Sequence, residues 1–327
     1  MANQNQKKKL LCLMQILMEC TDEKHIMSAA DLCAELQKYD VTAERKSIYN
    51  DIAVLQEVGL DIIQQKGSRP GYYLASREFE LAELKLLVDA VQASKFITSK
   101  KSAELIKKLE HQASKHDAQY LRRDVFIYNR PKSVNETIYY NVDLIHAALR
   151  SRSQIEFQYA EWTTKKELKL KKDGALYRVS PWSLTWDDQN YYLIAYDEEA
   201  DKIKHYRVDK MQKMQVLEKE RVGKQQFHDF DLAEFAKKTF SMYGGHDETV
   251  SLKCSNHLAG VVLDRFGTDV MMIPTNDGYF KVKVLVAVSP TFFGWVAGIG
   301  DGMEIAGPAH VREEYKEYLQ KLLKKYE

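Results

Sequence analysis

The order of elements in residues 1–76 is the feature that most restricts how this chain can fold. Apolar residues recur at helical spacing, and Ser28 is a favourable N-cap for the second of three helical segments. Gly59 ends the third segment, and two short β-branched and aromatic segments follow it. The predicted elements are helices over residues 8–20, 29–37 and about 43–58, and strands over 61–65 and 71–74.

The third helix predicts a nucleic-acid contact. On a helical wheel Ile48, Ile52 and Leu55 share one face, which must be the core face. Three helices before a hairpin is the order of a winged helix-turn-helix, whose third helix enters the major groove and whose hairpin tip meets the backbone. The residues expected to contact DNA are Arg45, Lys46, Ser47, Tyr49 and Asn50 on the helix, with Lys66 and Arg69 in the hairpin turn. An ordinary amphipathic helix with solvated charges is the alternative.

The net charge of the chain does not indicate nucleic-acid binding. The whole chain has a net charge of +1, and residues 1–75 hold nine Lys and Arg against ten Asp and Glu. Any DNA-binding surface must therefore be a local arrangement of charge.

The sequence predicts a cytoplasmic protein without a membrane span. Lys7–Lys9 before an apolar run imitate a signal peptide, but Glu19 and Asp22 follow without a cleavage site, so an amphipathic helix is predicted. The four cysteines form no Cys-x-x-Cys pair, which argues against a disulfide framework and a zinc site. Cys254 and His257 are only two candidate ligands, so no metal is expected.

The remainder of the chain predicts an α+β protein with several domains. Two helices with a break near Thr98 suit a connector or a dimerisation strut, and a helix over 138–150 leads into short strands of a curled antiparallel sheet. A helical stretch near 229–240, strands over 249–306 and a last helix over 308–326 follow. The predicted domains are 1–76 (winged helix-turn-helix), 77–136 (helical connector), 137–222 (β-barrel sensor) and 223–327 (α+β extension).

Several motifs, in a fixed order, resemble winged-helix regulators that carry a WYL domain. The resemblance rests on Arg45–Ile52, Gly71–Leu74, Arg178–Leu184, Tyr191–Leu193, Tyr206–Met211 and Phe293–Gly300. Tyr191 stands where the name-giving tripeptide has Trp, Lys210 where the family usually has Arg, and Asn50 where it often has a basic residue. The resemblance implies an Sm-like β-barrel that senses a ligand, often nucleotide-like, and a C-terminal extension.

Basic and aromatic residues of the strand-rich region suit an anionic ligand with a stackable ring. The predicted ligand-binding residues are Tyr159, Arg178, Tyr191, His205, Arg207 and Lys210. The alternative is that aromatic residues such as Tyr191 and Tyr206 are core, and that the basic residues pair with carboxylates such as Asp209.

The hypothesis is therefore a transcriptional regulator that binds a double-stranded DNA operator as a homodimer and responds to a small anionic, nucleotide-like effector. An enzyme is the first rival, but no phosphate-binding glycine loop or nucleophile motif occurs, and Gly298–Gly302 has the character of a turn. No catalytic residue and no cofactor are expected. A second rival is a regulatory protein whose barrel binds single-stranded DNA or RNA.

Overall fold

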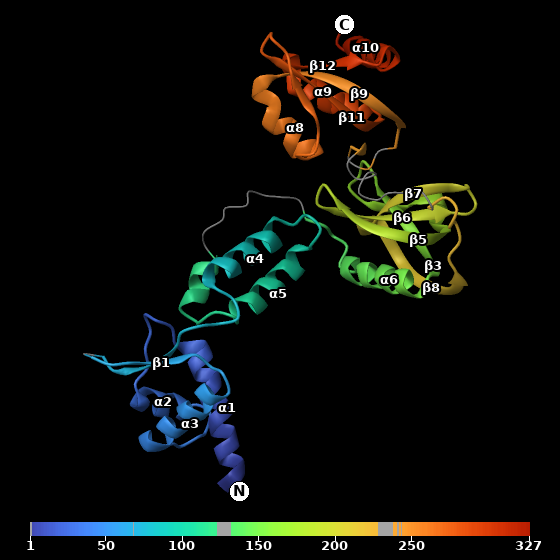
Figure 1. Ribbon diagram of the computed structural model, residues 1–327. Helices are drawn as coiled ribbons and strands as arrows, with labels where there is room; N and C mark the ends of the chain where they lie inside the picture. The colour runs from blue at the N-terminus through green and yellow to red at the C-terminus, as the bar shows by residue number, and fades with distance from the viewer. Residues whose placement is uncertain (1, 68, 123–131, 228–237, 241, 243) are drawn as a thin grey trace. The chain divides into compact units, whose positions relative to one another are not determined.

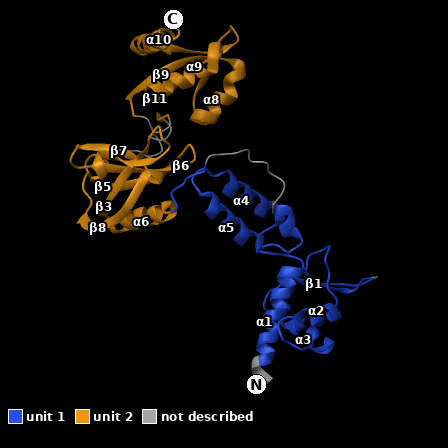
Figure 2. Cartoon of the chain, turned by 180° about the vertical axis from the view of Figure 1, so that it is seen from behind, with its two compact units in different colours: residues 1–136 blue, residues 137–327 orange. Residues whose placement is uncertain are grey.

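The computed structural model describes residues 2–67, 69–122, 132–227, 238–240, 242 and 244–327. It divides into two compact units, residues 1–136 and 137–327 (Figures 1 and 2). Helices and several antiparallel sheets make up the units, as expected of an α+β protein. The helical stretch expected near 229–240 falls almost wholly outside the described residues. Among the described helices, none combines the length and the apolar character that crossing a membrane requires.

Three helices and a hairpin form the first part of unit 1. They are α1 (Ala2–Cys20), α2 (Ala29–Gln37), α3 (Arg45–Glu57), β1 (Ile62–Gln65) and β2 (Gly71–Leu74). One apolar core joins all five elements, with Leu13, Leu32, Ile48 and Ile62 among its buried members. The start predicted for α1 at residue 8 was wrong, because the Gln and Lys residues before it are themselves good helix formers.

Local chemistry explains the start of α2 and the position of the hairpin. The Ser28 hydroxyl accepts the Asp31 amide while the Asp31 carboxylate accepts the Ser28 amide, a reciprocal capping box. Met27 exchanges two backbone hydrogen bonds with Tyr72, which attaches β2 to the segment before α2. Gly71 is required there, because a Cβ would lie 2.6 Å from the carbonyl oxygen of Met27.

A small helical part completes unit 1. It contains α4 (Leu81–Ala93), α5 (Ser99–Glu110) and the 3-10 helix η1 (Asp117–Arg122). The break between the helices lies where it was predicted, because the Thr98 hydroxyl caps α5 by accepting the Lys101 amide. Leu84, Val88 and Leu121 are buried in this second, smaller core.

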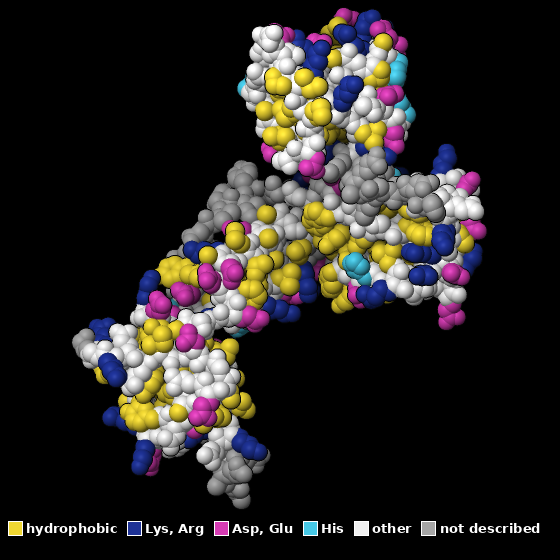
Figure 3. Space-filling view, in the orientation of Figure 1, with side chains coloured by type: hydrophobic (Ala, Val, Ile, Leu, Met, Phe, Trp, Pro, Cys, Tyr) yellow, Lys and Arg dark blue, Asp and Glu magenta, His cyan; other side chains and the backbone are white. Residues whose placement is uncertain are grey.

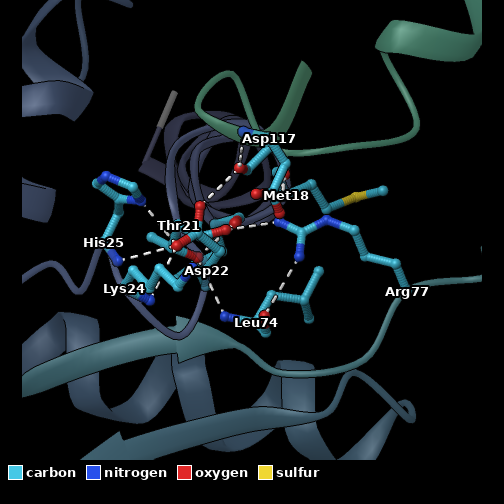
Figure 4. A network of polar contacts seen from close by, with 10 residues as sticks. Met18, Thr21, Asp22, Lys24, His25, Leu74, Arg77 and Asp117 are labelled. Atoms are coloured by element: carbon cyan, nitrogen blue, oxygen red, sulfur yellow. Dashed lines mark hydrogen bonds and ion pairs between the residues drawn. The ribbon is translucent and has the colours of Figure 1, made fainter. Parts of the chain in front are cut away.

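A buried carboxylate joins the two parts of unit 1 (Figure 4). Asp22, at the end of α1, accepts the Lys24 and His25 amides and the His25 Nδ1 on one oxygen, and the Ser114 hydroxyl at 2.6 Å on the other. The His25 ring also stacks on His116, with 3.5 Å between the ring centroids. Residues before η1 are thereby held to the end of α1.

Arg77 supports the same junction from the chain that leaves the hairpin. Its guanidinium donates to the carbonyl oxygens of Met18 and Thr21, at 2.9 and 2.5 Å, and to that of Leu74 (Figure 4). Thr21 in turn receives the Leu74 amide on its hydroxyl, at 3.0 Å. Carbonyls at the end of a helix lack intrahelical partners, so Arg77 satisfies acceptors that burial would otherwise leave unpaired.

Asp22→Asn is expected to lower the free energy of unfolding of unit 1 by about 1–3 kcal/mol at neutral pH, because a buried acceptor of several hydrogen bonds loses its charge. Burial by itself raises the pKa of Asp22, but the hydrogen bonds from Ser114, His25 and Lys24 outweigh it and hold the pKa below 3.8. Stability from this carboxylate is therefore present above pH 3.8 and is lost as the pH falls through the lower folded value.

Urea unfolding followed by circular dichroism at neutral and acidic pH measures both effects. The matched control is Asp61→Asn, at an exposed aspartate of the same unit. If Asp22→Asn keeps the acid sensitivity of the wild type, the carboxylate of Asp22 is not its source.

Unit 2 begins with α6 (Ile138–Ser151), which packs against a six-stranded antiparallel sheet. The strand order is β4-β3-β5-β6-β7, and β8 also pairs with β3. The strands are β3 (Ser153–Trp162), β4 (Leu168–Leu170), β5 (Leu176–Asp187), β6 (Asn190–Asp197), β7 (Lys202–Arg207) and β8 (Met211–Glu220). The sequence predicted strands over 154–159, 177–179, 191–196 and 203–208; the first three are shorter than β3, β5 and β6, and the last is shifted by one residue from β7. β4 and β8 were missed because they contain few β-branched residues.

A second antiparallel sheet, in the order β10-β11-β9-β12, forms the end of unit 2. Its elements are β9 (His246–Ser255), α8 (Ala259–Phe266), β10 (Met272–Pro274), β11 (Tyr279–Val288), α9 (Pro290–Ile299), β12 (Met303–Gly307) and α10 (Ala309–Leu323). The sequence predicted strands throughout 249–306, so α8 and α9 correct that expectation. α9 begins where the Ser289 hydroxyl accepts the Phe292 amide and Pro290 occupies the first turn.

Candidate nucleic-acid interface and effector site

The outer face of α3 is exposed, while its inner face is buried. Ile48, Ile52 and Leu55 are at most 3% exposed, as the helical wheel predicted. On the opposite side Arg45, Lys46 and Asn50 are exposed and form no hydrogen bond or ion pair with any described residue. No side chain caps the N-terminus of α3. The first two turns of this helix therefore carry cationic and amide side chains without a partner among the described residues.

Ser47 and Tyr49 are less available than their neighbours. The Lys9 ammonium of α1 donates to the half-buried Ser47 hydroxyl and pairs with the buried Asp51 carboxylate, with a nitrogen–oxygen distance of 2.8 Å. Tyr49 is 48% exposed, and its ring leans on Tyr72 at 6.2 Å between centroids. The sequence did not predict this role of Lys9, because it depends on contact with a helix about 40 residues later. Lys9 thus connects α1 to α3.

Lys66 and Arg69 lie in the turn between β1 and β2. Both are exposed, and neither pairs with a described residue. Figure 3 shows Lys and Arg side chains around the free end of the hairpin and along the same side of the part that contains α1, α2 and α3. The local arrangement of positive charge that the near-neutral composition required is thus present in the first part of unit 1.

Aromatic residues of strands β3, β5 and β7 pack against one another in the first sheet of unit 2. Tyr206 packs edge-on against Phe157, Tyr159 and Tyr177, with centroids 5.3 to 6.1 Å apart. Burial raises the pKa of Tyr159 to about 12. The Tyr159 hydroxyl accepts the Arg207 amide at 3.1 Å, so this predicted ligand residue is tied to β7 through the backbone.

Arg207 is held by partners within the protein. Its guanidinium binds both oxygens of Asp209, at 3.0 and 2.8 Å, and donates to the Asn190 side chain at 2.9 Å. The hydrogen bond with Asp209 raises the pKa of Arg207. Bidentate pairing of this kind fixes the fork of the guanidinium.

His205 lies on the same face of β7 as Arg207, opposite Ile194 of β6. This face carries a small apolar cluster of Tyr192, Ile194 and Met242. Burial lowers the pKa of His205 to about 4. The imidazole is therefore neutral near pH 7 and carries no charge with which to attract an anion.

Lys210 follows β7, at the end of the 3-10 helix η3 (Val208–Lys210). It is half-buried, and it forms no hydrogen bond or ion pair with the residues that the structure describes. Burial, and then the nearby Arg207, lower the pKa of its ammonium group. A desolvated ammonium beside a second cation is stabilised by an added anion.

Arg178 and Tyr191 lie apart from this group. The Arg178 side chain is 66% exposed and binds the buried Glu156 at 3.0 Å, across strands β5 and β3. Tyr191 lies on the opposite face of β6 from Tyr192 and packs edge-on against Trp186 at 4.5 Å. Of the six predicted residues, Tyr159 contacts the backbone of Arg207, and His205 shares a face of β7 with Arg207. Lys210 lies three residues further along the chain.

Family comparisons assign both sheets of unit 2. Residues 140–216 match the model of the WYL domain, and residues 246–323 match that of the WCX domain. The first match covers α6 and most of the first sheet, and the second covers the sheet from β9 to α10. No curated protein matches the chain.

Two solved structures are distantly similar. One is proteasome accessory factor B/C (PafBC) of Arthrobacter aurescens, at 16% identity and a TM-score of 0.27, covering 98% of this chain and 49% of that one. The other is described as a CRISPR Cas-related protein, at 10% identity and a TM-score of 0.37, covering 90% and 77%. The chain spans about half the length of the first structure, and neither similarity carries an argument about this protein. The chain thus carries a WYL domain followed by a WCX domain.

Proposed function

We propose that this chain is a sequence-specific, DNA-binding transcriptional regulator in the cytoplasm, with residues 1–76 as its winged helix-turn-helix. The observation that carries the proposal is the exposed face of α3, where Arg45, Lys46 and Asn50 are unpaired among the described residues above a fully buried inner face. Arg and Lys suit guanine or phosphate, and Asn suits adenine. The unpaired Lys66 and Arg69 at the end of the hairpin suit the DNA backbone. The role is binding, not catalysis.

Selection of DNA targets from the protein's own genome, followed by titration of the selected duplex with the full chain, tests this function. We expect duplex binding that weakens steeply with salt and a stoichiometry of two chains per site, because one such helix covers too little DNA for useful specificity. Tighter binding to single strands of the same sequence would favour the rival, in which the sheet of the WYL domain is the main contact. No binding to either form would contradict the proposal.

We further propose that the WYL domain, as an Sm-like β-barrel, senses an anionic, nucleotide-like effector. Support comes from Lys210, a half-buried cation without a partner among the described residues, beside the fixed guanidinium of Arg207. Coupling between effector and DNA is commonly about 1–3 kcal/mol and is reciprocal.

Lys210→Ala is expected to weaken the effector response by about tenfold while leaving DNA affinity without effector unchanged. Lys210 is a better test than Arg207, because Arg207→Ala would leave the Asp209 carboxylate unpaired and destabilise the domain. Mononucleotides and a short phosphorylated single strand are the probes, and DNA affinity is the readout. Lys202→Ala, at an exposed lysine of β7, is the matched control. An undiminished response in Lys210→Ala would move the effector site elsewhere.

A further inference from the structure

The start of β9 and the start of α10 lie beside one another in the WCX domain. β12 pairs with β9 antiparallel, from Met303 opposite Cys254 to Gly307 opposite Ser251. Beyond Gly307 the chain continues as α10, whose first turns contact the start of β9 through His310 and Glu314. Residues some 60 positions apart in the sequence thereby share one surface.

Two histidines and two glutamates meet on this surface. His246 and Glu248 are two apart on β9 and so share a face of the strand, while His310 and Glu314 are four apart on α10 and share a face of the helix. Nε2 of His310 lies 3.0 Å from Oε2 of Glu248, and Nε2 of His246 lies 3.7 Å from Oε1 of Glu314. Figure 3 shows His side chains beside acidic side chains at the edge of this domain next to α10.

The ligand atoms of three of these residues are close enough to share one ion. One atom each from His246, His310 and Glu314 lie within 4.8 Å of one another. Two ligands at about 2.1 Å from a tetrahedral zinc ion are about 3.4 Å apart, so small rotations of half-exposed side chains complete the geometry. Each histidine already points a ring nitrogen at a carboxylate of the other element, which is where a shared cation would lie.

We propose that His246, His310 and Glu314, with Glu248 at their side, form a binding site for a divalent transition-metal ion of the class of Zn²⁺. Two imidazoles and a carboxylate are a donor set for borderline metal ions, whereas Mg²⁺ and Ca²⁺ prefer oxygen ligands throughout. The alternative is two surface ion pairs, which contribute little to stability and need no metal. The ion would join the first strand of the WCX domain to its last helix.

Zinc titration of the full chain, freed of metal by a chelator, tests the proposal. We expect zinc to raise the midpoint of unfolding of unit 2 and Mg²⁺ at the same concentration to leave it unchanged, because only the folded domain brings the ligands together. Tryptophan fluorescence reports this unit alone, since Trp162, Trp182, Trp186 and Trp295 all lie in it. Zinc bound at the His25–His116 pair of unit 1 therefore does not contribute to this signal.

The variant His246→Gln/His310→Gln should bind zinc at least about tenfold more weakly in calorimetry and should lose the zinc-dependent shift of unit 2. His257→Gln, at an exposed histidine of the same domain outside the cluster, should behave as the wild type. Glu314→Gln keeps both imidazoles and should weaken binding to a lesser degree, so it carries the test if the double variant does not fold. Unchanged zinc affinity in these variants, or no zinc effect on unit 2 of the wild type, would overturn the proposal.

Discussion

Arg45→Ala/Lys46→Ala is expected to weaken binding to the operator duplex by about 2–6 kcal/mol, since each contact to a base contributes about 1–3 kcal/mol. Both side chains are exposed on the first turn of α3 and pair with no described residue, so the whole loss is expected in binding. Exposed substitutions of this kind change stability by about 0.5 kcal/mol or less. Fluorescence anisotropy with labelled duplex at several salt concentrations is the measurement.

Salt dependence separates the two kinds of contact. If Arg45 or Lys46 binds a phosphate, the variant should lose affinity for all sequences alike, and the slope of log affinity against log salt should decrease by about one for each contact. If the contact is to a base, discrimination between sequences should decrease and the slope should stay nearly constant.

Lys107→Ala/Lys108→Ala is the matched control. It removes the same charge from the same unit, at two exposed positions of α5. This control should bind DNA as the wild type does, because an exposed charge away from the interface is screened beyond about 8–10 Å. Equal loss of affinity in both double variants would mean that overall charge, and not the face of α3, determines binding.

Acidification from about pH 6.5 to about pH 4 is expected to destabilise unit 2 by up to about 3 kcal/mol through His205 alone. Burial lowers the pKa of this imidazole to about 4 in the folded protein, whereas the unfolded chain has the ordinary value of 6.5. Between these values the unfolded chain binds a proton that the folded protein excludes. The free energy of unfolding therefore decreases as the pH falls through this window, and it is constant above it.

Urea unfolding followed by tryptophan fluorescence at about pH 7.5 and about pH 4.5 measures the loss in unit 2. His205→Gln, which cannot be protonated, should remove most of the pH dependence. His146→Gln, at an exposed histidine of α6 in the same unit, should leave it unchanged. If His205→Gln unfolds with the same pH dependence as the wild type, another group titrates in this window. A pKa of about 4 leaves His205 without a change of charge near neutral pH.

Periodicity and capping residues were sufficient to predict where α2 and α5 begin and which face of α3 is buried. Ser28 and Thr98 start α2 and α5 where the sequence placed them, and Ile48, Ile52 and Leu55 are buried as the wheel of α3 required. These features depend on interactions between residues three or four apart, which a single sequence contains. The exposure of Arg45 and Lys46 follows from the same helical period.

Prediction from the sequence was wrong where contacts with distant segments override the local preference for helix or strand. The aromatic and β-branched residues of α9 suggested a strand, yet this segment is a helix because Phe292, Phe293 and Val296 are buried together in the core of the WCX domain. β8 forms because β3 has a free edge beside it, although its own residues are weak strand formers. Such choices are made by burial against distant segments.

The chemistry of the candidate sites was decided in the same way. Residue types alone grouped Arg178, Arg207 and Lys210 as cations for one ligand. In the structure Arg178 pairs with Glu156, and Arg207 pairs with Asp209. Lys210 has no partner among the described residues. The sequence argued against a metal site from the spacing of its cysteines and from the Cys254/His257 pair, and it did not bring His246 and His310 together, because they are far apart along the chain. Local periodicity thus determined the helices of unit 1 and the faces that they bury, whereas the charge state and the partners of each polar group depend on which distant residues the fold brings within a few ångströms.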